Sequence, residues 1–230
     1  MGNVDFRDYR IDDIQYNIDM MGITPLDVMV TGATGTGKST TLNTLFKKKV
    51  AKVGRGVDPE TMNIESYGLN DYFRLWDTPG LGDGVVKDSK HKKKIMELLY
   101  KTYSANNRKY GLIDLVLVII EGSSRDLGTV YSLLNEVIVP NIQKDRILVA
   151  INQADISMKG RHWESDLCVP DEVLAVHLNE QALSIQHRVK EATGVKIIKP
   201  VCYSAEYNWN IEKVMDLIID NMPRERRKIE

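Results

Sequence analysis

The strongest chemical signal in the sequence is a glycine-rich segment at residues 32–39, which reads GATGTGKS. It matches the pattern G-x-x-x-x-G-K-[ST] at every fixed position. The glycines allow backbone N–H groups to turn inward and cradle phosphate oxygens, while Lys38 brings a positive charge and Ser39 offers a hydroxyl to Mg²⁺. An apolar run at 28–30 predicts a strand before the segment, and residues 40–46 predict a helix after it. This context favours a phosphate-binding loop over a glycine-rich turn that binds nothing.

A second candidate segment, residues 76–80, reads WDTPG and follows a predicted strand. A carboxylate at Asp77 can hold a metal ion through water, and the backbone N–H of Gly80 can donate to the outermost phosphate of a nucleotide. Taken alone, the segment also fits a Thr-Pro-Gly turn after an edge strand. Its position downstream of the glycine-rich loop favours a role in the site.

Two further segments predict which base is read. Residues 152–155 (NQAD) come directly after a predicted strand, and the carboxylate of Asp155 can accept from both N1–H and the 2-amino group of guanine. Adenine presents no such pair of donors. Residues 204–206 (SAE) follow the last predicted strand, where small side chains let a backbone N–H approach the guanine O6. Each segment alone also fits a polar turn, but their order along the chain indicates a guanine site.

The elements that must position these residues alternate along the chain from Leu26 onward. Alternating apolar runs and helical patterns predict an α/β layer sandwich with a mostly parallel sheet. The predicted strands are residues 27–31, 62–69, 72–76, 115–120, 147–151 and 196–203. The predicted helices are residues 38–48, 90–103, 127–139, 171–192 and 211–221. The second and third strands, joined by Asn70 and Asp71, predict an antiparallel hairpin at one edge.

An additional short helix is predicted at residues 8–21, where Ile11, Ile14, Ile18 and Met21 recur at helical spacing. Its acidic residues argue against binding to a membrane surface. The apolar side of this helix either packs on the domain behind it or contacts a partner.

The four chemical segments together resemble the guanine-nucleotide motifs of the Era-like and septin-like GTPases, in the translation-factor-related class of P-loop proteins. The resemblance covers residues 26–221. The stretches GATGTGKST and DTPGLGD are similar to septins and to immunity-associated and chloroplast-translocon GTPases. The length without extra domains resembles small Era-like bacterial GTPases, including those carried on prophages.

This resemblance implies a three-layer P-loop NTPase G domain with a six-stranded, mostly parallel sheet and one antiparallel edge strand. The implied boundaries are an N-terminal helical extension at 1–24, the GTPase domain at 25–222 and a basic tail at 223–230.

The resemblance also implies that the ligands are GTP or GDP and Mg²⁺, and that GTP is hydrolysed slowly in a nucleotide-dependent switch. It assigns catalysis to Lys38, Thr61 and Gly80, and the metal to Ser39, Thr61 and Asp77. Contacts with the nucleotide are implied for Gly32, Thr34, Gly35, Thr36, Gly37, Lys38, Ser39, Thr40, Asn152, Gln153, Asp155, Ser204 and Ala205.

Three positions depart from the pattern of these families. Gln153 replaces a lysine in the base-reading motif, so we expect weaker base binding with specificity retained. Leu81 stands where Ras-like proteins carry the glutamine that orients the attacking water, which implies slow intrinsic turnover. Gly35 replaces the asparagine of potassium-activated relatives, which argues against activation by potassium.

Several residues or partners are candidates for the catalytic contact that Leu81 cannot make. Arg55 and Arg125 are either arginine fingers, acting in cis or across a dimer, or solvated surface residues. Asp83 and His91 are weaker candidates for contact with the water. A homodimer through the nucleotide face or an unknown protein activator would also supply help. The alternative function is a GTP-dependent dimerisation or interaction module with little intrinsic hydrolysis. A third interpretation, a P-loop kinase or ATPase, would require that the NQAD segment matches the guanine-binding pattern only by chance.

The overall composition is compatible with many functions, but its charge balance limits the kinds of binding partner. The chain has 230 residues, with 31 Lys and Arg against 32 Asp and Glu and a net charge of −1. This balance does not support binding to nucleic acid or a membrane, although the basic runs at 90–94 and 224–228 fit either solvated surfaces or local binding to RNA or phospholipid. Cys168 and Cys202 predict reduced thiols in a cytoplasmic protein. In the loop at 156–170, Trp163 is either a lid anchor or a partner contact.

Overall fold

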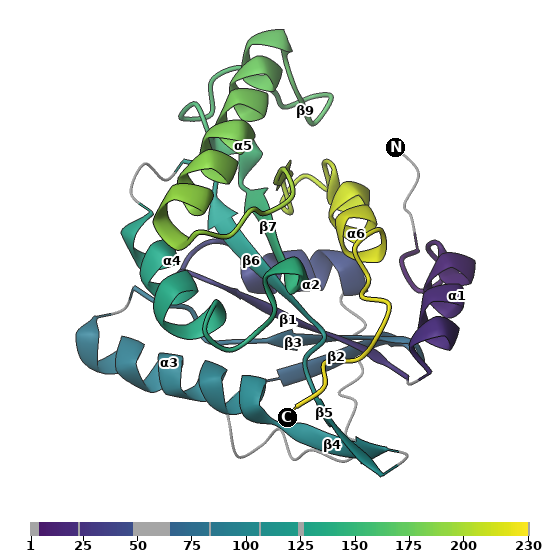
Figure 1. Cartoon of the computed structure of the whole chain (residues 1–230). Helices are drawn as coiled ribbons and strands as arrows, with labels where there is room; N and C mark the ends of the chain where they lie inside the picture. Colours follow the sequence, from purple (N-terminus) through teal and green to yellow (C-terminus); the bar gives the residue numbers. More distant parts are fainter. Residues whose placement is uncertain are drawn as a thin grey trace.

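The computed structural model describes residues 5–22, 24–47, 65–82, 84–105, 107–123 and 127–229. In this part of the chain, a six-stranded sheet lies between two layers of helices (Figure 1). The α/β fold expected from the sequence is therefore confirmed. The strands follow the order β10 (Val201–Cys202), β7 (Ile147–Asn152), β6 (Leu115–Glu121), β1 (Leu26–Gly32), β3 (Phe73–Asp77) and β2 (Glu65–Asn70).

Neighbouring strands of this sheet are parallel except at one edge, where β2 runs antiparallel to β3. The central strands β1 and β6 are buried along almost their whole length. Their runs of Val, Ile and Leu are typical of strands that helices cover on both faces. Because the strands are parallel, the carboxyl ends of β1, β3, β7 and β10 share one edge, and open α/β sheets bind their ligands at that edge.

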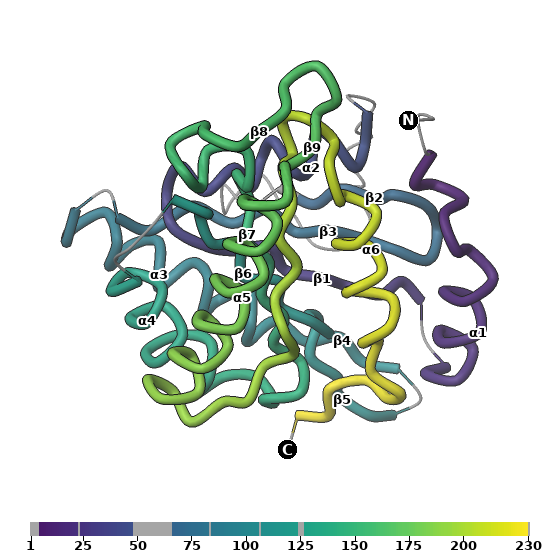
Figure 2. Tube along the Cα trace, turned by 90° about the horizontal axis from the view of Figure 1, so that it is seen from above, coloured from purple at the N-terminus to yellow at the C-terminus, as the bar shows by residue number. Residues whose placement is uncertain are grey.

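The helices form two separate hydrophobic cores with the sheet. Side chains of α1, α2 and α6 pack on one face, and those of α3, α4 and α5 pack on the other. Figure 2 shows α1 and α6 on one side and α3, α4 and α5 on the other. The helices are α1 (Ile11–Met21), α2 (Lys38–Phe46), α3 (Val85–Tyr100), α4 (Gly128–Leu133) with its π-helical continuation Leu134–Ile138, α5 (Glu172–Thr193) and α6 (Ile211–Ile219), besides 3-10 turns at Lys144–Arg146 and Ala154–Ile156.

The N-terminal helix packs on the domain behind it, which is one of the two arrangements that the sequence allowed. Ile14 and Ile18 are fully buried against the α2 and α6 side of the sheet. Just before the helix, the Arg10 guanidinium forms ion pairs with Asp216 at 2.9 Å and Asp220 at 2.8 Å, from α6 and its C-terminal end. This helix is therefore fixed to α6 by both apolar and charged contacts.

Several predicted boundaries are wrong. The helix predicted at 90–103 begins at Val85 and ends at Tyr100, and a hairpin of β4 (Thr102–Ala105) and β5 (Arg108–Gly111) follows it. Tyr103 and Tyr110 stack across this hairpin at 5.8 Å, a cross-strand pair that stabilises strands. The strand predicted at 196–203 is reduced to Val201–Cys202, at the edge of the sheet beside β7.

Two further segments differ from expectation. The loop predicted at 156–170 contains a small hairpin of β8 (Trp163–Glu164) and β9 (Val169–Pro170). In the C-terminal tail, Arg226 and Arg227 are 3% and 6% exposed, so neither alternative for this run, a solvated surface or local binding to RNA or phospholipid, holds for these two residues. Among the described helices, none is long and apolar enough to cross a membrane.

Candidate nucleotide-binding site

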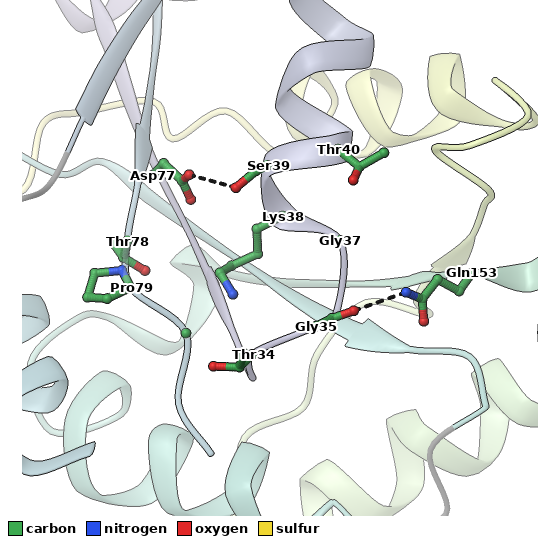
Figure 3. A pocket seen from close by; sticks show the side chains of 11 residues that line it. Thr34, Gly35, Gly37, Lys38, Ser39, Thr40, Asp77, Thr78, Pro79 and Gln153 are labelled. Carbon is green, nitrogen blue, oxygen red and sulfur yellow. Dashed lines mark hydrogen bonds between the residues drawn. The ribbon is translucent and has the colours of Figure 1, made fainter. Parts of the chain in front are cut away.

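A cavity of about 780 Å³ opens at the edge where the parallel strands end. It brings together three of the four segments that the sequence singled out, since residues of the glycine-rich loop, the WDTPG segment and the NQAD segment all line it (Figure 3). The lining residues are Thr34, Gly35, Gly37, Lys38, Ser39, Thr40, Asp77, Thr78, Pro79, Gly80 and Gln153.

The glycine-rich loop runs from the end of β1 to the first turn of α2. Gly35 and Gly37 have φ angles of 84° and 81°, a region that L side chains rarely adopt. A Cβ on Gly37 would also lie 2.2 Å from Asn152 Nδ2. The Lys38 ammonium donates to Ala33 O at 2.8 Å and to Gly32 O at 3.3 Å, so it lies across the loop. The loop is thus a backbone cradle with one buried cation.

The two predicted metal ligands that the structure describes lie together. Ser39 Oγ donates to Asp77 Oδ2 at 3.2 Å, although the residues belong to α2 and β3. Next to Asp77, Thr78 Oγ1 donates to Val30 O at 2.9 Å and fixes the end of β3 to β1. A hydroxyl and one carboxylate are hard oxygen donors that suit Mg²⁺, which takes its other ligands from phosphates and water. These residues therefore fit the ion.

The segment after Asp77 packs directly on the glycine-rich loop. A Cβ on Gly80 would lie 2.7 Å from Thr34 Oγ1, so a larger residue would displace the loop. Leu81 O accepts from Thr34 N at 2.7 Å, and the Leu81 side chain is only 1% exposed within the hydrophobic core. The leucine at the position of the Ras-like glutamine therefore faces the core rather than the cavity. His91 Nδ1 contacts Gly80 O at 2.6 Å.

Asn152 connects the two ends of the candidate site. Its side chain is 2% exposed. Its Nδ2 donates to Thr36 O at 2.9 Å, and its Oδ1 accepts from Ala205 N at 3.0 Å. The amide therefore ties the glycine-rich loop to the loop that follows β10, and its polar atoms serve to position both.

Two of the predicted base-reading residues have acceptor atoms without a hydrogen-bond partner among the described residues. Gln153 Nε2 donates to Gly35 O at 3.0 Å, but its Oε1 is buried without a hydrogen-bond partner in the part of the chain that the structure describes. Asp155 Oδ1 is also buried, with no partner among the described residues. Because buried acceptors are normally paired, these atoms fit a ligand that presents donors, as the N1–H and 2-amino group of guanine do.

Burial raises the pKa of two titratable side chains in and directly after β10, behind the predicted base-reading loops. Burial raises the pKa of the Tyr203 phenol above its usual range, and its hydroxyl shares a 2.8 Å hydrogen bond with Thr41 of α2. Burial also raises the pKa of the Cys202 thiol to about 12. Neither Cys168 nor Cys202 forms a disulfide in the structure.

Some predicted residues lie outside the described ranges, namely Thr61, Asp83 and the candidate arginine fingers Arg55 and Arg125. The sequence reasoning missed the anchoring hydroxyl of Thr78 and the tie between Thr41 and Tyr203. A hydroxyl residue directly before Pro79 carried no distinctive signal, and the second contact joins positions far apart in the sequence.

The fold and the cavity define this chain as a P-loop GTPase domain. The family model described as "50S ribosome-binding GTPase" matches residues 27–153, which is more than half of the chain. The chain therefore belongs to this GTPase family.

The chain is similar to curated proteins of two kinds. Septin-12 from Homo sapiens is 38% identical over 90 residues, which cover 34% of this chain and 25% of the septin. The probable GTP-binding protein EngB from Bacillus cytotoxicus is 23% identical over 158 residues, covering 68% of this chain and 75% of EngB. The match thus spans about a quarter of the septin.

Solved structures share the fold. A GTP-binding protein from Sulfolobus solfataricus in complex with GDP has a TM-score of 0.54 at 17% identity, over 92% of this chain and 57% of that chain. The LeoA bacterial dynamin GTPase from ETEC has a TM-score of 0.51 at 13% identity, over 92% of this chain and 38% of that chain.

Proposed function

We propose that the chain binds GTP and GDP together with Mg²⁺, and that it hydrolyses GTP slowly as a nucleotide-dependent switch. The observation that carries this proposal is the meeting of the glycine-rich loop, the Ser39–Asp77 pair and Gln153 around one cavity. Membership of a GTPase family supports it. The related GTP-binding protein from S. solfataricus, whose structure holds GDP, has the same fold.

Within this proposal, different residues bind the phosphates and the base. Lys38 and the loop amides neutralise the phosphates, and the N–H of Gly80 donates to the γ-phosphate. Ser39, Asp77 and Thr61 hold Mg²⁺, which when bound neutralises charge on the phosphate oxygens. Beyond the residues that line the cavity, Asp155 accepts from the base and the 204–205 loop approaches O6, while the Asn152 side chain ties the glycine-rich loop to the 204–205 loop.

The expected slow turnover follows from the orientation of Leu81. Its buried side chain cannot orient water, so the chain relies on positioning and charge stabilisation of the phosphates. Further help would come from Arg55, Arg125 or a partner. The same observation favours a second candidate, a GTP-dependent dimerisation or interaction module that barely turns over. Similarity to Septin-12 is consistent with either. An Era-like origin and a cytoplasmic location remain predictions.

Binding of fluorescent GDP, GTP and ATP in the presence of Mg²⁺ tests the proposal directly. We expect guanine-selective binding, and we would measure phosphate release across a range of protein concentrations. Release per molecule that rises with concentration indicates a GTPase activated by self-association, whereas flat and near-zero release indicates the interaction module. Size-exclusion mass with GDP and with a non-hydrolysable GTP analogue separates the two further. Equal binding of ATP contradicts the proposal.

A further inference from the structure

Three aromatic side chains form a cluster beside the residues that we expect to read the base. The rings of Trp163 and Tyr207 lie 5.2 Å apart with a 50° tilt, and the rings of Trp163 and Trp209 lie 5.9 Å apart with an 89° edge-to-face geometry. Both distances lie in the range of favourable aromatic pairs. Figure 2 shows the β8–β9 hairpin beside the segment that precedes α6.

This aromatic cluster joins the two base-reading segments. Trp209 and Ser204 exchange backbone hydrogen bonds of 3.0 Å in both directions, which closes the loop that carries Ala205. On the other side, Trp163 packs in a small hydrophobic cluster with Ala154, the neighbour of Asp155. This small cluster is distinct from the two main cores on the faces of the sheet. Its position makes Trp163 a bridge between the two loops rather than a part of the main core.

The hairpin that carries Trp163 is itself fixed to α5. His162 Nδ1 lies 2.7 Å from Asp171 Oδ2, and Asp171 N donates to His162 O at 2.9 Å. The second oxygen of Asp171 caps α5 by accepting from Leu174 N at 2.9 Å. Trp163 Nε1 is buried and has no acceptor within the described part of the chain, so packing rather than a hydrogen bond holds the ring. Helix α5, the β8–β9 hairpin and the Trp163 ring are therefore held together as one unit.

The geometry points to Trp163 as a positioning residue for base selection. Asp155 would contact N1–H and the 2-amino group, and the 204–205 loop would contact O6, so both loops must address adjacent atoms on one edge of the same base. Their separation has to be held closely for both contacts to form together. The ring of Trp163, wedged against Tyr207 and Trp209, sets that separation. This inference rests on the proposed function and adds the residue that enforces base discrimination.

The test compares Trp163→Ala, Trp163→Phe and Leu167→Ala. Leu167 lies on the same hairpin and is 66% exposed, so it serves as the matched control. We would measure dissociation of fluorescent GDP and the affinity ratio of GDP to inosine diphosphate, which lacks the 2-amino group. We expect Trp163→Ala to speed dissociation of GDP by about tenfold and to reduce the GDP preference by about fivefold. Trp163→Phe should recover most of both effects, and Leu167→Ala should match the wild type.

Two results would overturn the inference. One is a Trp163→Ala protein that releases GDP at the wild-type rate. The other is equal weakening of GDP and inosine diphosphate, which indicates a purely structural role. If Trp163→Ala fails to fold, Tyr207→Ala removes one ring pair from a side chain that is 37% exposed, and the same ratio decides. A wild-type protein that binds no guanine nucleotide refutes the proposed function itself, a result distinct from both.

Discussion

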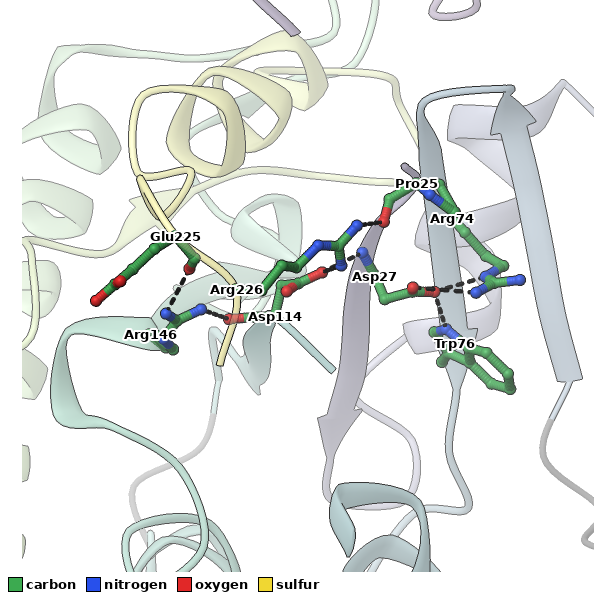
Figure 4. A network of polar contacts seen from close by, with 8 residues as sticks. All are labelled: Pro25, Asp27, Arg74, Trp76, Asp114, Arg146, Glu225 and Arg226. Atoms are coloured by element: carbon green, nitrogen blue, oxygen red, sulfur yellow. Dashed lines mark hydrogen bonds and ion pairs between the residues drawn. The ribbon is translucent and has the colours of Figure 1, made fainter. Parts of the chain in front are cut away.

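The two ends of the parallel strands carry polar side chains in contrasting ways. At the carboxyl ends, small and hydroxyl-bearing residues surround an open cavity of about 780 Å³. At the amino ends, charged side chains are packed against one another under the C-terminal segment (Figure 4). The open end has room for a ligand, whereas at the closed end the charged side chains are buried against one another.

The closed end is built from buried ion pairs. Arg74 Nε and Asp27 Oδ1 lie 2.5 Å apart, and Trp76 Nε1 donates to the same oxygen at 2.7 Å. Arg226 pairs with Asp114 and also donates to the carbonyl of Pro25, and both charged side chains of this pair are at most 1% exposed. Because a buried charge that loses its partner is costly, this end should tolerate substitution poorly. The comparison thus separates residues that we propose to bind the ligand from residues that we expect to stabilise the fold.

Lys38→Ala should give the largest effect, and at the open end only. Removing the cation that lies across the glycine-rich loop should lower affinity for GDP and GTP by about a thousandfold, which abolishes binding at micromolar nucleotide. Thermal unfolding without nucleotide should change little. Lys93→Ala, on a 76% exposed side chain of α3, is the control for loss of one positive charge. Wild-type affinity in Lys38→Ala would remove this lysine from the phosphate site.

Arg226→Met should give the opposite result. The substitution leaves Asp114 buried without its partner, so the free energy of unfolding should fall by about 3 kcal/mol. The fraction that stays folded should bind GDP with wild-type affinity, because the ion pair lies at the far end of the sheet. Denaturant titration measures the first quantity and fluorescent GDP the second. Arg224→Met, on an exposed neighbour, is the matched control and should change neither. Unchanged stability in Arg226→Met would show that the closed end is not a stability element.

The open end could be predicted from the sequence because its chemistry lies in short contiguous motifs. The order of residue types within 32–39 and within 76–80 is enough to predict a role for each segment. The strands before them are apolar enough to be recognised. The mostly parallel sheet followed from the alternation of strands and helices, and its antiparallel edge followed from the short connection at Asn70 and Asp71. What the motifs did not contain was the side-chain tie through Asn152, which joins Thr36 to Ala205.

The closed end could not be predicted because its contacts join distant positions. Asp114 and Arg226 are 112 residues apart, and an arginine in a basic tail looks the same in the sequence whether it is solvated or buried. The hairpin of β4 and β5 was missed for a related reason, since its strands are only four residues each and the pattern before them is helical. Trp163 was visible as an unusual residue, but its ring partners come from another loop.

Asp155→Asn tests whether the open end selects the base as well as binding phosphate. An amide in place of the carboxylate loses a charge-assisted acceptor, so affinity for GTP should fall by about thirtyfold. Xanthosine triphosphate, which carries a second oxygen where guanine has its amino group, should then bind better than GTP. Competition against fluorescent GDP measures both. Asp166→Asn, on an exposed residue of the neighbouring hairpin, should leave the preference for guanine intact. If Asp155→Asn keeps that preference too, Asp155 does not read the base.

Of these substitutions, His91→Ala should have the smallest effect. It should slow phosphate release at the open end without weakening the binding of GDP. His91 Nδ1 holds Gly80 O at 2.6 Å, and we assign the N–H of the same Gly80 to the γ-phosphate. Loss of this hydrogen bond should loosen the segment and slow phosphate release by about fivefold. GDP has no γ-phosphate, so its affinity should stay within about twofold of wild type. His187→Ala, on a 71% exposed side chain of α5, should change neither quantity. Equal loss of GDP affinity in His91→Ala would instead place this histidine among the binding residues, because a contact that matters before the γ-phosphate is present cannot act on turnover alone.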